Sequence, residues 1–237
     1  MIILFFFIFH WYISLFFQTF FLHRYASHKM FKMSKFTEKI CFLLTFISQG
    51  TSFLNPAGYA LMHRNHHKYS DTKNDPHSPQ SFRSIIEFNL KTFKEYRFYI
   101  KQVYLNKPES TDLPRWEFIE KLGDLWIVRM IFAFIYISIY VLYSPSYWYF
   151  LLLPIHFLMG PIHGFIVNWY GHKVGYRNFN LSDNSRNTLF IDILMLGELY
   201  QNNHHKNPNN PDFSIKWFEI DFGYLTLNFL KKLKIIK

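Results

Sequence analysis

Residues 1–22 carry no charged side chain, and this apolar stretch constrains the fold more than any other feature. As an α-helix it would be about 33 Å long, enough to cross the roughly 30 Å hydrocarbon core of a bilayer. A signal peptide is the alternative, but the stretch has neither a basic start nor a small-residue cleavage site. His10, Ser14 and Gln18 recur every fourth residue, on one face that we expect to contact protein. The stretch predicts a transmembrane helix.

Two further apolar segments, residues 125–143 and 147–169, are separated only by Ser144-Pro145-Ser146. We predict that they cross the membrane as a tight helical hairpin, with the long Arg129 side chain reaching the surface. The second segment contains prolines and glycines that bend a helix or allow close packing: Pro154, Gly160, Pro161 and Gly164. We therefore expect this third span to be kinked and closely packed against its neighbours.

Seven of the twelve histidines fall into three short clusters. The clusters are His23 with His28, then His63, His66 and His67, then His204 with His205. The middle cluster has the spacing i, i+3, i+4, which places its side chains on one helical face, and Gln201 begins a late cluster with the same spacing. The first pair is five residues apart, so both side chains can share a site only if the helix ends or unwinds between them. His172 follows the third span, one helical turn after Asn168.

With His172, the clusters supply eight imidazoles, more than one metal accepts, so the sequence predicts two metal ions. Imidazole is the commonest metal ligand and binds as the neutral base. Zinc-peptidase and soluble di-iron bundle chemistry is unsupported, because the patterns His-Glu-x-x-His and Glu-x-x-His are absent. The single Cys41 excludes a cysteine-rich zinc site and a cysteine-ligated iron–sulfur cluster. Nitrogen-rich sites suit iron, zinc or copper.

Residues 39–61 are partly apolar but are not expected to cross the membrane. The continuous run Ile40–Ile47 is short, and polar or helix-breaking residues follow it. A crossing here would place the first two histidine clusters on opposite membrane faces, so we expect the segment to lie in the interface. Three crossings then put all clusters on one side, and the Lys and Arg residues on that side indicate the cytoplasm.

These patterns predict an all-α integral membrane protein with three transmembrane helices, an interfacial segment and a helical cytoplasmic cap that carries a His-rich dimetal site. We expect one domain over residues 1–237, with residues 62–122 and 173–237 forming the cap. The net charge is +10, but the basic residues flank apolar segments and form no nucleic-acid motif, so we expect membrane lipid and no nucleic acid as a partner. We expect a bacterial inner membrane with the site in the cytoplasm.

The motifs resemble those of the integral-membrane fatty acid desaturases, close to the acyl-CoA desaturase branch. The similarity covers nearly the whole chain, through residues 23–28, 63–77, 168–172 and 197–205. It implies a di-iron centre that activates dioxygen and removes hydrogens from adjacent carbons of a saturated acyl chain, which leaves a cis double bond. The implied metal ligands are His23, His28, His63, His66, His67, His172, His204 and His205, with Asn168 acting through water.

Gln201 departs from the family pattern, which usually has histidine there, so it is a doubtful ligand with a weaker amide oxygen. Carboxylates commonly orient metal-binding imidazoles. The residues expected to support the ligands in this way are Asp71, Asp75, Asp183 and Glu198, together with His77. Tyr59, one turn before His63, is a candidate for the acyl tunnel. His10, His156 and His163 are expected to pack within spans or line the tunnel.

The resemblance implies a fatty acyl substrate carried by CoA, acyl carrier protein or lipid. An external donor must supply electrons, because the chain has no cysteine-rich or haem-binding domain, and a ferredoxin or a small haem protein is expected. Two alternatives remain open. One is a hydroxylase or ketolase of the same histidine-rich superfamily. The other is a non-catalytic membrane metal-binding protein, which would need ionisable residues throughout a crossing path, whereas the clusters lie beyond the span ends.

Overall fold

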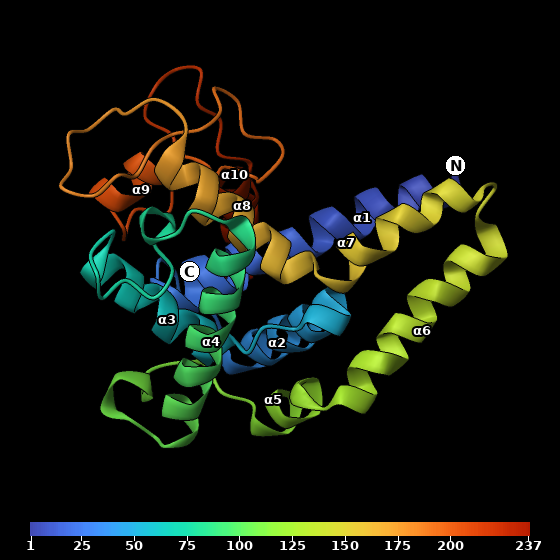
Figure 1. Ribbon diagram of the computed structural model, residues 1–237. Coiled ribbons are helices and arrows are strands. Elements are labelled where there is room, and N and C mark those ends of the chain that lie inside the picture. The colour runs from blue at the N-terminus through green and yellow to red at the C-terminus, as the bar shows by residue number, and fades with distance from the viewer.

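The computed structural model describes residues 1–237 as an almost entirely helical protein (Figure 1). Its α-helices are α1 (Ile2–Phe17), α2 (Lys35–Gln49), α3 (Pro56–Tyr69), α4 (Ile85–Tyr104), α5 (Glu117–Asp124), α6 (Trp126–Tyr143), α7 (Leu153–Phe157), α8 (Met159–Lys173), α9 (Gln201–Lys206) and α10 (Phe222–Lys232). A π-helix, η1 (Gln18–Ser27), continues α1 without a break. Short 3-10 turns are η2 (Gly50–Ser52), η3 (Pro79–Ser81), η4 (Pro108–Ser110) and η5 (Tyr147–Leu152). Extended segments form only three isolated bridges.

Two helices are long and apolar enough to cross a membrane: the continuous helix Ile2–Ser27 and α6. The segment from Tyr147 to Lys173 makes a third candidate only as a bent pair, because it turns by 73° between α7 and α8. The predicted kink is therefore confirmed. Pro161 lies in the first turn of α8 and has no N–H for the helical ladder. Next to it, Gly160 packs against η2, and its N–H donates to Ser52 Oγ at 3.0 Å.

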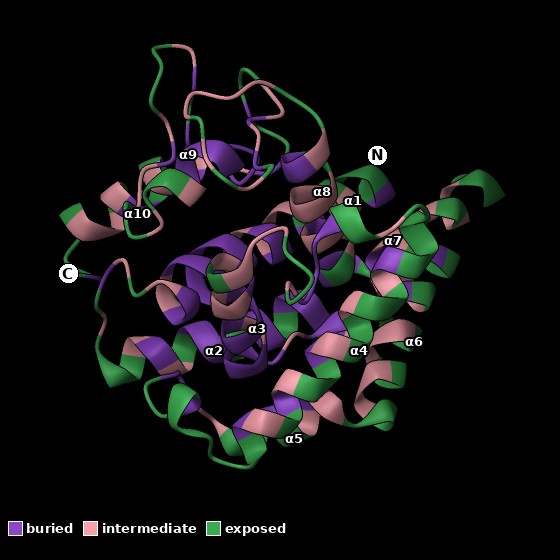
Figure 2. Ribbon diagram, turned by 60° about the vertical axis from the view of Figure 1, so that its left-hand side comes forward, coloured by how far each residue is buried: buried purple, intermediate pink, exposed green.

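The apolar helices and the histidine-bearing segments lie at opposite ends of the molecule. Figure 1 shows α1, α6 and α7 extending toward the N-terminus, whereas α3, α9, α10 and the loops around them gather at the other end. Figure 2 shows buried residues concentrated around α2, α3 and α9, with much of α6 exposed. His10, Ser14 and Gln18 are all buried, so the polar face of the first span contacts protein as predicted.

The α2 helix occupies most of the segment predicted to lie in the membrane interface. With 15 residues it is about 22 Å long, shorter than a bilayer core. One face buries Phe42 and Phe46 in the main core, while the other exposes a row of apolar side chains: Phe36, Ile40, Leu43, Leu44 and Ile47. This amphipathic arrangement suits a helix lying between water and lipid, and the interfacial placement stays a prediction.

The main hydrophobic core fixes η1 against α2, α5 and α10. It is rich in aromatic residues, and Phe16 stacks on Phe20, which in turn stacks on Phe31, with ring centroids 5.2 and 4.8 Å apart. The C-terminus closes this core: Ile236 is buried in it, and the backbones of Lys32 and Lys237 exchange two hydrogen bonds of 2.8 Å. The helix that carries the first two histidines is thus held on several sides.

Arg129, expected to reach the membrane surface, contacts backbone carbonyls of another segment, and its position relative to the membrane stays a prediction. Its guanidinium donates to the carbonyl oxygens of Thr51 and Phe53 at 2.6 and 3.2 Å. Those carbonyls belong to η2 and the irregular chain after it, where no helical ladder would satisfy them. The side chain therefore joins α6 to η2.

Candidate metal centre

The π-helix brings the first two histidines of the chain onto one face. In η1 the backbone bonds run from residue i to i−5, as in the 3.2 Å bond from His28 N–H to the His23 carbonyl, so residues five apart are neighbours. The ring centroids of His23 and His28 are accordingly 4.9 Å apart. Ser27 Oγ also donates to the Leu22 carbonyl, five residues back, at 2.8 Å. The helix widens, instead of ending or unwinding between the two histidines as the sequence suggested.

Five imidazoles from three helices converge in a first group. Their Nε2 atoms form a continuous series of contacts: His23 to His204 at 3.1 Å, His204 to His67 at 2.9 Å, His67 to His63 at 3.0 Å and His63 to His28 at 2.8 Å. The contacts join the end of η1, α3 and α9, so residues far apart in the sequence make one cluster.

Hydrogen bonds between the rings cannot explain this series. A neutral imidazole nitrogen carries either one proton or one lone pair, so four successive contacts through the same five atoms cannot all be donor–acceptor pairs. Two nitrogens bound to one metal at about 2.1 Å and at a right angle to each other are about 3.0 Å apart. The observed spacing therefore fits neighbouring ligands of a metal ion.

A second group is formed by His66, His172 and His205. The Nε2 atoms of all three are buried and lie beyond hydrogen-bond reach of any protein group. The ring centroids are 4.8 to 5.2 Å apart. Buried polar atoms nearly always have a partner, so three unpaired nitrogens facing one space fit a second metal ion. His66 and His67 are neighbours in α3, and because His67 belongs to the first group and His66 to the second, this helix contributes to both.

Four carboxylates fix the orientation of the histidine rings. His66 Nδ1 donates to Asp75 at 2.9 Å, His172 Nδ1 to Asp71 at 2.9 Å, and His205 Nδ1 to Asp183 at 3.0 Å. In the first group, His23 Nδ1 lies 2.6 Å from Glu198. A proton held on Nδ1 leaves the Nε2 lone pair free for a metal. These are the four carboxylates that the sequence singled out for this role.

Burial keeps the imidazoles in the form that binds metal. Desolvation lowers the pKa of His63, His66, His67 and His204 well below the ordinary value for histidine. These rings are therefore neutral near pH 7 and offer lone pairs. Burial raises the pKa of Glu198, but His23 and Arg24 more than offset it, and the net pKa is lowered.

Sequence reasoning missed Arg24, which is only 1% exposed beside the first group. Its guanidinium donates to Glu198 at 2.7 Å and to both oxygens of Asp221 at 3.0 and 2.8 Å. The guanidinium also lies 4.1 Å from the ring centroid of Phe213. Arg24 thus holds the carboxylate that contacts His23. The sequence signal was that Arg24 directly follows His23, a candidate ligand. Arginine side chains are usually exposed, so this signal did not predict burial.

His77 lies beside the second group, whereas Gln201 packs against α8 and lines a cavity next to the first group. The His77 ring centroid is 4.5 Å from that of His66, and His77 Nε2 is buried without a protein partner. Gln201 Nε2 donates to the Glu198 carbonyl at 2.7 Å, and its side chain packs directly against Gly171. Asn168 Nδ2 donates to the Gly164 carbonyl at 2.8 Å within α8.

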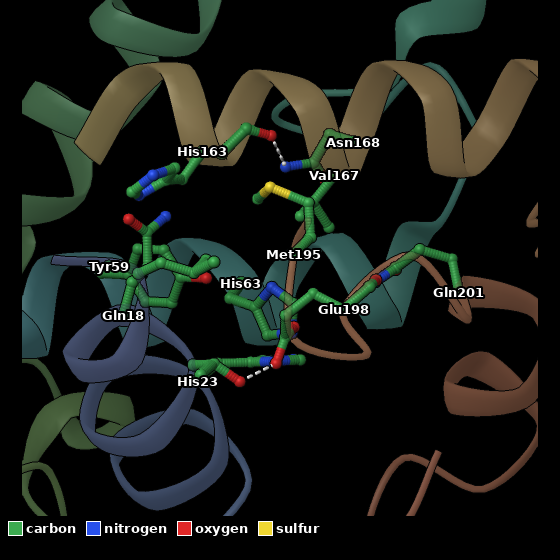
Figure 3. Close-up of a pocket in the computed structure, with 13 residues that line it drawn as sticks. Gln18, His23, Tyr59, His63, His163, Val167, Asn168, Met195, Glu198 and Gln201 are labelled. Carbon is green, nitrogen blue, oxygen red and sulfur yellow. Dashed lines mark hydrogen bonds and ion pairs between the residues drawn. The ribbon is translucent and has the colours of Figure 1, made fainter. Parts of the chain in front are cut away.

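A cavity of about 390 Å³, including its open mouth, adjoins the first group (Figure 3). Its wall includes His23 and His63, and also Asn168, Gln201 and Tyr59. The Tyr59 ring stacks on His63 with an interplanar angle of 7°. Apolar side chains also line it: Leu15, Val167 and Met195. His23 and His63 of the first group therefore border a small, partly apolar space.

Two of the histidines within the spans pair with each other, away from the metal centre. His10 Nδ1 lies 2.6 Å from His156 Nδ1, His10 Nε2 lies 2.8 Å from the Ser48 carbonyl, and the Tyr140 hydroxyl lies 2.9 Å from His156 Nε2. They pack between α1, α6 and α7. His163 instead lines the cavity.

Comparison with known proteins places the chain in a family. It matches the family model for fatty acid desaturases over residues 1–223. It is 28% identical to an sn-1 stearoyl-lipid 9-desaturase of Anabaena variabilis, over 88% of this chain and 73% of that protein. It is 26% identical to a hex-5-enoyl-(acyl-carrier protein) acetylenase of Moorena producens, over 91% and 70%. An acyl-CoA C20 Delta5-desaturase of Anemone leveillei is 28% identical, over 89% and 65%.

The chain therefore belongs to the fatty acid desaturase family. It is an acyl desaturase, an oxidoreductase of lipid metabolism, from a membrane-bound and metal-dependent family. The resemblance predicted from the histidine motifs and the all-helical membrane fold are both confirmed.

Proposed function

We propose that the protein is a dioxygen-dependent desaturase that introduces a cis double bond into a saturated fatty acyl chain, with two iron ions held by the two histidine groups. The observation that carries this proposal is the pair of convergent sets of imidazole nitrogens, five in one and three in the other, beside a partly apolar cavity. When bound, the irons would supply the oxidising power for removing hydrogen from unactivated carbons.

The reaction balances without any group in the chain changing its oxidation state. One acyl chain, one dioxygen, two electrons and two protons give an acyl chain with one more double bond and two waters. An external donor supplies the electrons, for which we propose a ferredoxin or a small haem protein. The net charge of +10 favours an acidic donor.

The protein's own residues contribute position and a dry environment. Leu15, Val167 and Met195 provide apolar surface for the acyl chain, and Tyr59 packs against His63 at the wall nearest the first group. Held in one place, the chain presents a fixed pair of carbons, so that position and not acidity selects the bond to be formed. The four carboxylates keep the imidazoles in a single tautomer, and Asn168 and Gln201 offer amide groups at the wall of the cavity beside the first group.

The carrier of the acyl chain is a lipid, an acyl carrier protein or CoA, the three carriers for which these relatives are named. We propose that the active site faces the cytoplasm of a bacterial inner membrane. This orientation places the three histidine-bearing ends of η1, α3 and α9, which lie together in the fold, on the side with the basic residues.

Expression in a desaturase-deficient host, with the fatty acids profiled by gas chromatography and mass spectrometry, tests the proposal. We expect new cis monounsaturated chains and about two irons per purified chain. His67→Ala should abolish formation of the double bond and lower the iron content of the purified protein. Lys68→Ala, on the exposed side of α3, should change neither quantity. Hydroxylated chains without double bonds would instead identify a hydroxylase, and iron-loaded protein that turns over no acyl substrate with dioxygen and reductant would reject desaturation.

A further inference from the structure

The cavity beside the metal centre contains a polar pair that desaturation of a plain hydrocarbon does not use. Gln18 and His163 both line it, and their side chains are 5% and 0% exposed. Gln18 Oε1 and both ring nitrogens of His163 have no hydrogen-bond partner in the protein. Figure 3 shows the Gln18 amide and the His163 ring pointing toward each other from η1 and α8.

The protein does little to satisfy these atoms. Trp11 packs its ring edge-on against His163, with centroids 4.5 Å apart, and provides only apolar contact. A buried polar group without a hydrogen-bond partner costs about 1–3 kcal/mol. The methylene groups of an ordinary acyl chain cannot form hydrogen bonds, so they would leave these atoms unpaired. The unpaired atoms thus point to a ligand that donates and accepts hydrogen bonds.

The pair lies on the membrane side of the metal centre. Gln18 precedes His23 by five residues in η1, and His163 precedes His172 by nine residues in α8, about 14 Å along the helix axis. An acyl chain that extends from the cytoplasmic end past His23 and His63 therefore meets the pair beyond the carbons that are oxidised.

We propose that the cavity selects an acyl chain bearing a hydroxyl or carbonyl oxygen several carbons beyond the oxidised pair, bound by Gln18 and His163. A hydroxyl can donate to Gln18 Oε1 and accept from the single N–H of a neutral His163 ring. A site built to hydrogen-bond a hydroxyl discriminates strongly against the analogue without it. This inference rests on the proposed function only in assuming that acyl chains enter this cavity.

Equilibrium binding tests it without requiring turnover. The purified protein in lipid nanodiscs is titrated with methyl hydroxystearates that differ in hydroxyl position, and with methyl stearate as the reference. We expect at least one hydroxyl position to bind about tenfold more tightly than methyl stearate, in line with the free energy of one or two buried hydrogen bonds. Gln18→Met and His163→Phe preserve approximate shape, remove the polar atoms and should each reduce the preference at least fivefold, as about 1 kcal/mol of lost hydrogen bonding requires.

Ser14→Ala is the matched control. Ser14 lies one turn before Gln18, is equally buried and has an unpaired Oγ, but it does not line the cavity. It should leave the preference unchanged. Equal or absent binding across the series would overturn the proposal, as would a preference that both cavity variants retain. Loss of desaturation with the hydroxyl preference intact would count against the proposed function alone.

Discussion

Asp71 Oδ2 accepts a hydrogen bond of 2.9 Å from His172 Nδ1, which ties the turn after α3 to the end of α8. The same carboxylate accepts from the hydroxyl of Ser78 at 2.6 Å and the backbone N–H of Asn184 at 2.7 Å. Burial raises the pKa of Asp71, but these hydrogen bonds, with His172 foremost, lower it well below the ordinary value. The turn is therefore an anionic anchor for one imidazole of the second group.

Asp71→Asn should weaken the second metal site by 10- to 100-fold, as an order of magnitude, because an amide is uncharged and does not fix the His172 tautomer. The measurement is iron content against chelator concentration, with desaturase activity in parallel. Asp112→Asn is the control, since Asp112 pairs with Lys29 and Arg64 at the surface. Unchanged iron retention in Asp71→Asn would contradict the role of the anchor.

Gln201→His tests the position that departs from the family pattern. The Gln201 side chain packs against Gly171 so closely that a Cβ there would lie 2.4 Å from Gln201 Cγ. An imidazole must fit the same space and would lose the 2.7 Å bond to the Glu198 carbonyl. We expect activity to fall about tenfold, the size of effect usual for residues that support metal ligands. A rate equal to that of the unsubstituted protein would make Gln201 a bystander.

Arg24→Met should destabilise the protein by about 3–5 kcal/mol, because it leaves Glu198 and Asp221 as buried charges without their cation. Chemical unfolding in detergent, followed by circular dichroism, measures the effect. The comparison is Lys91→Ala, which breaks a surface pair with Glu95 and should cost less than about 1 kcal/mol. Similar losses in both variants would show that the buried network contributes little.

Asp112 should contribute stability that depends on pH. Burial raises the pKa of this carboxyl, but Arg64 and Lys29 outweigh it and lower the pKa to about 2. Because the pKa is lower in the folded than in the unfolded protein, the contribution of Asp112 to the free energy of unfolding is complete above the unfolded pKa of about 4. It is lost as the pH falls toward the folded value of about 2. Because the side chain is 40% exposed, the effect is below about 1 kcal/mol. The stability difference between the unsubstituted protein and Asp112→Asn should shrink between pH 5 and 3, as an approximate window; a constant difference would contradict the assignment.

Much of the site could be predicted from spacing and residue type. The i, i+3, i+4 arrangement of His63, His66 and His67 determines one helical face, and α3 presents it. The nearby carboxylates could be selected because imidazole ligands need acceptors on Nδ1. These features could be predicted because the histidines of one face lie within one or two helical turns, and because few side chains can accept a hydrogen bond from Nδ1 of a metal ligand.

The wide helix could not be predicted in this way. No residue in Gln18–Ser27 has a known preference for π-helical bonding, and the conformation is fixed by packing of Phe20, Phe21 and Leu22 and by the burial of Arg24. The pairing of Arg24 with Asp221 and the position of Gln18 opposite His163 in one cavity likewise depend on contacts between distant segments. The contacts of Arg129 could not be predicted for the same reason, because the carbonyls that it binds come from another part of the chain.

The π-helical geometry of η1 makes the number of residues between His23 and His28 a structural requirement. Deleting one residue would leave an ordinary α-helical spacing and rotate every residue beyond the deletion by about 100° around the axis. His28 would leave the first group, and the Ser27 bond to Leu22 would lose its register. Related chains aligned through these two histidines should therefore vary in length in surface turns such as residues 105–116, and not in this helix.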